Sequence, residues 1–546
     1  MKNKWLINGL KVLAVLIIGA VIFWFKLPPI NLRSTQFYMF LIDIVITVLV
    51  VFGGSKIFEI IKNSTKKSGY RVEFKPKLPK SLWVKIAISA ILLPLLVIVV
   101  GKIIGTPLFN ADKYKSLLSY QEGDFSKDVA ELSMNQIPVV DRDTASRLGK
   151  RKLGEMSDLV SQFEITENYT QINYKGSPYR VTLLAYGDIV KWLGNRQEGI
   201  PAYILVNMTT QETELIRLSE GIKYSDSELF MRNTMRALRY KFPTKIFDEV
   251  SFEIDEEGTP YWIAPTISYK IGIFSGRDID GAVIMNAITG EAEWFSLSEI
   301  PSWVDQVYIS DLVINQLNYN GLYQSGFFNS IFGQKGVLQT TEGYNYIAIG
   351  DDVYLYTGMT SVAQDESNVG FVLVNMRTKE TKFYKVPGAE EYSAMDSAEG
   401  KVQQMNYEST FPILLNIADR PTYFMSLKDS AGLVKMYAFV DVEQYQIVGT
   451  GQNVSEAKEN YEKELKGASV VPETEVQNEI ITLSGVIEEI DEAVVSGNTV
   501  YFIKLKNNPE IYSASITVSE KLVFLDEGET VTFKTEKNSG EIISIG

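Results

Sequence analysis

The sequence predicts an α+β protein that helices near its N-terminus anchor in a membrane, and three observations support this. Three apolar runs of membrane-spanning length occur before Gly105. Between about Val139 and Gly451, a pattern of one helix followed by antiparallel strands recurs about four times. From about Asn478 to Gly546, short strands follow one another at the spacing of a small β-barrel of OB or SH3 type.

The apolar runs predict a membrane domain, residues 1–105, with three transmembrane helices. Each run holds about 18–21 residues, near the ~20 that cross a bilayer as a helix. The runs are Ile7 to Phe25, Phe37 to Gly54 and Val84 to Ile104. The first connecting loop carries Lys26 and Arg33, whereas the second, residues 56–85, carries nine basic residues and two acidic ones. Positive charge favours the cytoplasmic side, so we expect the N-terminus inside and residues 106–546 outside.

Two further expectations concern this membrane domain. The basic loop 56–85 should lie along anionic lipid head groups. Asp43 sits within the second apolar run, where a carboxylate is costly without a partner. Lys102, near the outer end of the third run, lies at a similar depth, so we expect a structural Asp43–Lys102 ion pair. An ion or proton pathway is the alternative for Asp43, although one acidic residue in three helices is not typical of a transporter.

Two absences limit the chemistry. The chain has no Cys and no His, which excludes disulfides, thiolate nucleophiles and the Ser-His-Asp triad. The residues after Gly105 hold 38 basic and 64 acidic side chains, a net charge of −26 that argues against nucleic-acid binding. A solvated surface explains this charge, and binding of divalent cations is left open. A Cys-free body outside the cytoplasm fits a Gram-positive-type bacterium.

The strongest motif is Asn-x-x-Thr-x-Glu, which occurs three times between two alternating apolar runs. Its copies are Asn207, Thr210, Glu212; Asn286, Thr289, Glu291; and Asn375, Thr378, Glu380. A fourth, degenerate copy has Asp441 in the Asn position. Each copy reads as two antiparallel strands joined by a tight turn, in which the residue after Thr is expected in the left-handed conformation. These residues are Gln211, Gly290 and Lys379.

The similarity extends upstream, because an aromatic strand and a helical pattern precede each hairpin. The tyrosines of that strand, expected at equivalent positions, are Tyr179, Tyr261, Tyr346 and Tyr423. Each unit has one helix to cover one sheet face, so neighbouring units are expected to pack in a row, with the fourth the most divergent. After the fourth unit, a charged helix from Val454 to Leu465 is predicted with Ser455 as its N-cap.

These patterns divide the chain into seven parts. A juxtamembrane segment follows the membrane domain, four units follow it, and a small β-barrel domain ends the chain. Their predicted bounds are 106–138 for the segment; 139–220, 221–305, 306–390 and 391–468 for units 1 to 4; and 469–546 for the barrel.

A helix followed by an antiparallel sheet with a hairpin of the type N/D-A-x-T-G-E resembles the PepSY-type domain. The segment from Val283 to Glu291, VIMNAITGE, is the most similar copy, and Gln211 and Lys379 replace its Gly in two others. The resemblance covers the four units. It implies a non-catalytic extracytoplasmic module, in a family linked to binding or restraining peptidases of the cell envelope.

Two classes of function therefore remain. The favoured class is a non-catalytic binding or scaffold protein with an envelope protein as its partner and with no cofactor. The alternative is an envelope glycan hydrolase that uses paired carboxylates. Its candidate residues are Asp351-Asp352, Asp255-Glu256-Glu257 and Asp278-x-Asp280, the last of which also hints at a calcium loop. Ser-x-x-Lys pairs occur at Ser455 and Ser64, but they lie at a helix start and in the basic loop.

Overall fold

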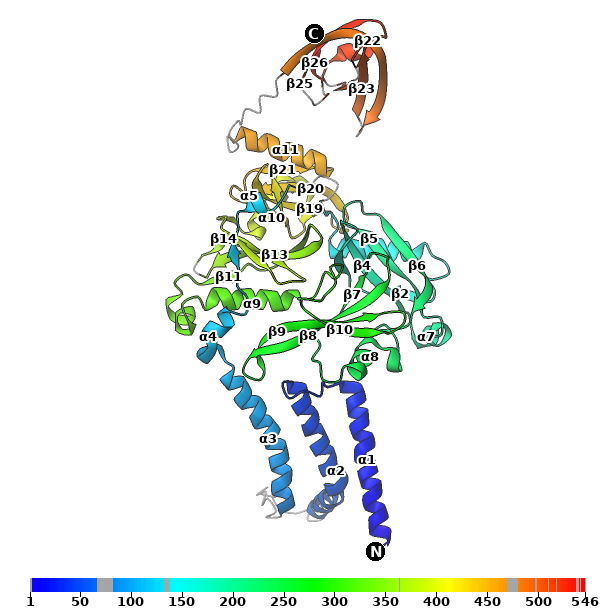
Figure 1. Cartoon of the computed structure of the whole chain (residues 1–546), viewed down its shortest axis with the longest axis vertical. Coiled ribbons are helices and arrows are strands. Elements are labelled where there is room, and N and C mark those ends of the chain that lie inside the picture. The colour runs from blue at the N-terminus through cyan, green and yellow to red at the C-terminus, as the bar shows by residue number, and fades with distance from the viewer. Residues whose placement is uncertain are drawn as a thin grey trace. The chain divides into compact units, whose positions relative to one another are not determined.

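The structure is a computed structural model of the 546-residue chain. It describes residues 2–65, 82–131, 137–362, 364–468, 480–495, 498–508, 510–516, 518–536, 540 and 542–545. The chain divides into two compact bodies, Met1–Glu462 and Lys463–Gly546 (Figure 1). Much of the basic loop, 66–81, lies outside the described residues, so its contact with anionic lipid stays a prediction.

The N-terminal helices include the candidate membrane spans. They are α1 (Lys2–Lys26), α2 (Thr35–Thr65) and α3 (Leu82–Ile104). Trp5–Lys26 and Thr35–Gly53 are long and apolar enough to cross a membrane, and many of their apolar side chains are exposed. Ile88–Ile104 of α3 meets α4 (Pro107–Lys115) at a bend of 59°, and this bent pair is a third span if it is counted as one.

An ion pair joins α1 to α2, but its partners differ from those expected. Lys26 Nζ lies 2.6 Å from Asp43 Oδ2, so Asp43 pairs with Lys26 and not with Lys102 in the described part of the chain. The short connection 27–34 brings the end of α1 against α2. The carboxylate therefore faces α1 rather than α3, a choice that depends on how the helices are rotated about their axes.

Each of the four units contains a helix and an antiparallel sheet, as predicted. Unit 1 has α6 (Arg142–Gly154), β2 (Phe163–Ile165), β3 (Thr170–Tyr174), β4 (Ser177–Tyr186), α7 (Ile189–Asn195), β5 (Ile200–Asn207) and β6 (Thr213–Ile222). Unit 2 has η2 (Phe230–Arg232), α8 (Thr234–Lys241), β7 (Ser251–Ile254), β8 (Pro260–Ile271), β9 (Ser275–Asn286) and β10 (Ala292–Ser296). The helix of unit 2, with 8 residues, is shorter than that of unit 1, with 13.

The third and fourth units follow the same order. Unit 3 has α9 (Ser310–Leu322), η3 (Asn329–Gly333), β11 (Leu338–Thr340), β12 (Asn345–Ile349), β13 (Asp352–Ser361), β14 (Gln364–Asn375), β15 (Thr381–Tyr384) and β16 (Gly388–Ala389). Unit 4 has α10 (Glu391–Lys401), η4 (Gln403–Met405), β17 (Glu408–Ser409), β18 (Ile413–Ile417), β19 (Arg420–Lys428), β20 (Val434–Asp441) and β21 (Val448–Gly451). The central strands are β4, β8, β13 and β19, and each pairs with the strand before it and the strand after it in the chain. The short strands β2, β11 and β17 pair with the same central strands from two places earlier.

The three Asn-x-x-Thr-x-Glu turns have the same geometry. In each, the Asn side-chain oxygen accepts hydrogen bonds from the backbone N–H groups two and three residues later, at 2.9–3.0 Å. The residue after Thr has a positive φ, 64° at Gln211, 75° at Gly290 and 64° at Lys379. The predicted left-handed position is therefore confirmed in all three turns.

The backbone of the residue after each turn-forming Asn or Asp ties three parts of a unit together. Its N–H donates to a carbonyl at the start of the central strand, that of Pro178, Pro260, Val353 or Pro421. Its C=O accepts from the segment that leads into the helix of the same unit. In unit 1 this carbonyl belongs to Met208, which accepts from Val139 at 2.7 Å and from Val140 at 3.2 Å. Ala287, Met376 and Val442 accept in the same way in the other units.

The tyrosines are not all equivalent, which corrects one expectation. Tyr179 lies opposite Asn207 and Tyr261 opposite Asn286, but the residue opposite Asn375 is Tyr354. Tyr346 lies on β12, one strand earlier. In unit 4, Thr422 lies opposite Asp441 and Tyr423 is one residue further along β19. Unit 3 has tyrosines on two consecutive strands, so the sequence pattern did not distinguish the central strand from its neighbour.

The units do not form an open row, because unit 4 packs back against unit 1. Gln211 Nε2 of the unit 1 turn donates to Tyr437 Oη of β20 at 3.2 Å, and Lys428 of β19 pairs with Asp141 at 2.6 Å. The remaining neighbours are also in contact, for example unit 1 with unit 2 through Tyr203 Oη and the Gly258 carbonyl, 2.9 Å apart. A closed arrangement covers surfaces that both ends of a row would leave open.

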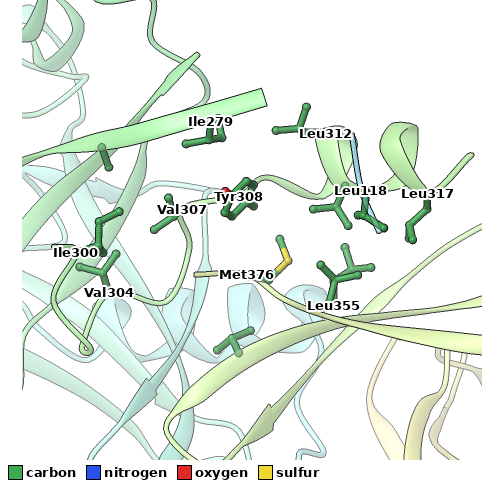
Figure 2. Close-up of a cluster of buried hydrophobic side chains, with 14 of the residues drawn as sticks. Leu118, Ile279, Ile300, Val304, Val307, Tyr308, Leu312, Leu317, Leu355 and Met376 are labelled. Carbon is green, nitrogen blue, oxygen red and sulfur yellow. The ribbon is translucent and has the colours of Figure 1, made fainter. Parts of the chain in front are cut away.

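One apolar core lies where unit 3 meets the sheet of unit 2. Helix α9 packs between the two sheets, with Leu312 and Leu317 buried against apolar residues of β8, β9, β13 and β14. Leu118, from the segment after α4, completes this core (Figure 2). The juxtamembrane segment continues as β1 (Gln121–Glu122), which pairs in parallel with β15, and α5 (Phe125–Asp128).

A lysine side chain from the unit 3 turn also lies at this boundary between units 2 and 3. Lys379, at the left-handed position of the unit 3 turn, extends its ammonium to Asp278 of β9 at 2.7 Å and to the Leu117 carbonyl at 3.0 Å. Both side chains are at most 15% exposed. At the equivalent position of unit 2, a side chain on Gly290 would collide with the Tyr224 ring.

We therefore predict that Lys379→Met destabilises the chain by about 3 kcal/mol, because the Asp278 carboxylate would stay buried without its partner. Denaturant unfolding of the detergent-solubilised full chain measures this change. The control is Lys335→Met, which alters an exposed lysine and should leave stability within about 0.5 kcal/mol. Equal effects of the two substitutions would contradict a stabilising role for Lys379.

The C-terminal body, Lys463–Gly546, contains five antiparallel strands around one core, which includes Ile503, Tyr512 and Phe533. The strands are β22 (Ile480–Val495), β23 (Asn498–Leu505), β24 (Ile511–Ser515), β25 (Thr530–Glu536) and β26 (Ile542–Ile545), with η5 (Glu520–Phe524) before β25. Their order is β24-β23-β22-β25-β26. The expected closed barrel is not found among the described residues, because β24 and β26 at the edges do not pair. The expected OB or SH3 type remains a prediction.

The charged helix after unit 4 is α11 (Val454–Gly467), as expected. Its N-cap is not Ser455 but Asn453, whose side-chain oxygen accepts from the Glu456 N–H at 2.9 Å. Because Asn and Ser cap helices about equally well, composition did not separate the two positions. Tyr461 of this helix is buried and bonds Asp441 at 3.1 Å, so the helix is fixed on the unit 4 sheet.

Unit 2 contacts the ends of the membrane helices. Arg239 of α8 donates to the Leu27 carbonyl at 2.9 Å, and the Ile30 N–H donates to the Pro243 carbonyl at 2.7 Å. At the end of α3, Gly101 lies against the ring of Phe274, in the β8–β9 turn. The α1–α2 connection and the C-terminal end of α3 therefore lie on the same side as the four units.

Candidate functional site

A cavity of about 1020 Å³ lies between the four units. Unit 1 contributes Tyr169, Gln171 and Arg180, and unit 2 contributes Phe252 and Trp262. Residues of units 3 and 4 complete the wall, including Gln306, Tyr344, Tyr346, Thr410 and Phe411. The sequence indicated the units but not this cavity, which exists because the units close on one another.

Asp141, at the start of α6, joins unit 1 to unit 4 at the cavity wall. Its carboxylate caps the helix by accepting from the Thr144 N–H at 2.9 Å, and it pairs with Lys428 of β19 at 2.6 Å. Burial works to raise the pKa of Asp141, but the bonds from Lys428 and Thr144 outweigh it and hold the pKa below its usual range. Asp141 is thus an ionised structural group.

Arg180 is the unusual residue of this wall. It lies on β4, is 7% exposed and lines the cavity. Its Nε is buried without a hydrogen-bond partner, and no other described residue accepts from its guanidinium. Burial lowers the pKa of Arg180 to about 10, although the charge of Asp141 works to raise it. The group therefore remains a cation at neutral pH. Arg180 stands out when the central strands of the four units are aligned by their register, because the three other units have Trp, Leu and Tyr at this position.

Carboxylates of three units surround the same space. They are Asp143 and Glu167 of unit 1, Asp226 and Glu249 of unit 2, and Asp311 of unit 3. Arg142 and Lys150 of α6 also line the cavity. Among the described residues, no group of three or more His, Cys, Asp or Glu side chains is placed to hold a metal ion. The lining is polar and charged without a metal centre.

The acidic residues singled out in the sequence lie outside this lining, and four of them have partners within the protein. Asp352 pairs with Arg377 at 2.7 Å, and Asp278 pairs with Lys379. Asp280 accepts from Thr266, and Asp255 accepts from backbone N–H groups in the turn before β8. The calcium-loop hint at Asp278-x-Asp280 is thus explained by contacts within the protein. The Asn, Thr and Glu residues of the motif shape hairpin turns and do not line the cavity.

Two acidic side chains are completely buried where units 1, 2 and 3 meet. Glu253 of β7 accepts from the Asp305 N–H at 2.8 Å, and Asp305 accepts from the Asn173 N–H at 2.7 Å. Burial raises the pKa of Glu253 to about 7, although backbone hydrogen bonds oppose it. Burial and the charge of Glu253 raise the pKa of Asp305 as well. The negative charge of either group therefore disfavours ionisation of the other.

This pair predicts that stability falls as pH rises. The pKa of Glu253 is about 7 in the folded chain and near 4.5 otherwise, so its contribution is complete below pH ~4.5 and is lost as pH rises through ~7. Glu253→Gln should therefore lose less melting temperature than the unchanged protein between pH 5 and pH 8. Thermal unfolding at both values measures this.

The matched control is Glu220→Gln, which changes an exposed glutamate on β6 and should leave the pH dependence unaltered. A Glu253→Gln protein whose melting temperature falls as steeply as that of the unchanged protein would rule out this carboxyl group as a source of the pH dependence.

Comparisons with known proteins add little. No protein-family model matches the chain. The genome polyprotein of human rhinovirus A serotype 89 is 23% identical over 176 residues, which cover 31% of this chain and 8% of the polyprotein. A B. megaterium levansucrase mutant aligns over 81% of this chain and 97% of its own, with 9% identity and a TM-score of 0.18. Dihydro-heme d1 dehydrogenase NirN aligns over 68% of this chain and 49% of its own, with 8% identity and a TM-score of 0.11.

Proposed function

We propose that the chain is a membrane-anchored, non-catalytic binding protein of the bacterial cell envelope. It would hold part of a partner in the cavity between its four units. The observation that carries this proposal is that all four units contribute residues to the wall of one cavity, which has a volume of about 1020 Å³. A polar, partly aromatic cavity of this size suits ligand binding. The four units would then be a scaffold that shapes one site.

The placement outside the cytoplasm rests on two independent arguments. The α1–α2 connection and the end of α3 contact unit 2, for example through Leu27 and Gly101. A spanning α1 then puts the N-terminus on the opposite side of the membrane from the four units. The loop 56–85, rich in Lys and Arg, lies at the other ends of α2 and α3 and favours the cytoplasm. This orientation requires α3 to be a third span.

Exposed apolar residues of units 1 and 2 support direct contact of these units with the bilayer surface. Trp24, near the end of α1, contacts the rings of Tyr240 and Phe230, with centroids 6.4 and 6.5 Å apart. Phe230 is exposed, as are Ile189, Val190 and Leu193 of the neighbouring helix α7. Aromatic and apolar side chains at this level are typical of the membrane–water interface.

The partner we propose is an envelope peptidase, which this protein would bind or restrain. The support is the resemblance of the hairpin around Asn286 to PepSY-type domains, together with the same turn geometry at Asn207 and Asn375.

The proposed orientation predicts the behaviour of reporter fusions. A reporter that is active only outside the cytoplasm should be active when fused after Gly546, because three spans place that end outside. Fusion of the same reporter within the loop 66–81 should be inactive. Activity of a cytoplasmic reporter after Gly546 would exclude the three-span orientation.

Crosslinking in intact cells tests the binding function. A photoreactive residue in place of Ser146, which lines the cavity, should capture an envelope peptidase that mass spectrometry identifies. The same residue in place of Ser219, which is exposed on β6, is the control and should capture much less. Equal capture at both positions, or capture of no peptidase, would contradict the proposal.

One observation favours a second function, an envelope glycan hydrolase. Carboxylates from three units, including Glu167, Glu249 and Asp311, line the same cavity. Paired carboxyl groups ~5–9.5 Å apart hydrolyse glycosidic bonds. The binding function predicts that purified protein releases no reducing ends from isolated cell-wall glycan. Release that Glu249→Gln abolishes would instead establish the hydrolase.

A further inference from the structure

We propose that the cavity is a carboxylate-binding site centred on Arg180, and that its ligand is a peptide whose C-terminal carboxylate meets this guanidinium. The inference rests on the proposed binding function and names the chemistry that the site recognises. Four observations carry it: the register of Arg180, its lack of partners, the use of the nearby Asp141, and the lining of the cavity.

The register shows that the fold does not require an arginine here. Arg180 lies opposite Val206, and the equivalent positions of the other central strands are Trp262, Leu355 and Tyr423. All three are buried, at 5%, 0% and 0% exposure. An uncompensated cation where three sister units use apolar side chains costs stability. Such a cost is typical of a residue kept for binding.

A second buried arginine shows what a structural role looks like in this chain. Arg239 of α8 is 3% exposed and donates to three backbone carbonyls, those of Leu27, Phe242 and Lys245. Arg180 is buried to a similar degree, and none of the described residues accepts from it. Its planar fork matches the two oxygens of a carboxylate and would bind them through parallel hydrogen bonds.

Asp141, the carboxylate whose charge acts on Arg180, already has two hydrogen-bond partners within the protein. Asp141 gives one oxygen to the Thr144 N–H and the other to Lys428 at 2.6 Å. An external carboxylate would therefore be the group that neutralises Arg180. Gln171, also on the cavity wall, has a buried Oε1 without a partner. This oxygen can meet a donor of the same ligand, and a peptide supplies such donors through its N–H groups.

The lining favours a peptide over a simple anion. The cavity wall also carries carboxylates, among them Asp143 and Glu249, and the rings of Tyr344 and Phe411. Carboxylates repel a dense dianion such as phosphate but attract the amino group or a basic side chain of a peptide. The volume of about 1020 Å³ accepts a ligand of several residues.

Thermal unfolding of the detergent-solubilised full chain tests this inference with three probes. The first is a degenerate tripeptide library with free C-terminal carboxylates, the second is the same library with C-terminal amides, and the third is inorganic phosphate. We expect the free-acid library to raise the melting temperature, because a ligand that binds only the folded state stabilises it. The amidated library and phosphate should not.

Two variants complete the experiment. Arg180→Leu introduces the residue that unit 3 has at this position, so without ligand its melting temperature should equal or exceed that of the unchanged protein. It should lose at least 100-fold in affinity for the free-acid library. Arg217→Leu removes an exposed arginine of β6 in the same unit and should bind as the unchanged protein does.

The following results would overturn the proposal: no shift with the free-acid library, an equal shift with the amidated library, a shift with phosphate alone, or a much lower melting temperature of Arg180→Leu without ligand. The last result would make Arg180 structural. Capture of a peptidase at Ser146 is independent of these outcomes, so a failure here leaves the proposed binding function standing and distinguishable.

Discussion

The backbone N–H and C=O of one residue in each unit fix the relation between hairpin, central strand and helix. The residue after the turn-forming Asn or Asp donates to the start of the central strand and accepts from the segment that enters the helix, as Met208 does in unit 1. Buried backbone groups must find partners, so this geometry leaves little freedom in how the helix meets the sheet. The Asn side chain shapes the turn that brings this residue into place. The shared motif therefore specifies a whole unit rather than a single turn.

The left-handed residue of these turns shows how a repeated backbone can serve different neighbours. Its backbone is the same in three units, yet Gln211 bonds unit 4, Lys379 pairs with unit 2, and Gly290 lies against the ring of Tyr224. A left-handed backbone costs a non-glycine residue about 1 kcal/mol or more. The contacts of Gln211 and Lys379 offset that cost, which explains why both depart from glycine.

Local features could be predicted from the sequence, whereas features that depend on packing could not. The turns around Asn207, Asn286 and Asn375 follow from side-chain chemistry within six residues. The partner of Asp43 depends on helix rotation, and the true equivalent of Tyr261 depends on which of two tyrosine-bearing strands is central. The cavity required closure of the units, which hydrophobic periodicity does not encode. Arg180 became conspicuous once the strand register placed it beside the apolar residues of the other units.

Closure of unit 4 on unit 1 has a consequence for how the chain is made. Lys428 and Asp141 are 287 residues apart in the sequence, so their contact forms late. A chain that is synthesised from its N-terminus presents unit 1 long before unit 4 exists. During that interval the surfaces that later enclose the cavity are open to chaperones and proteases. The quality control of this protein would thus depend on the speed of synthesis as well as on the stability of the finished fold.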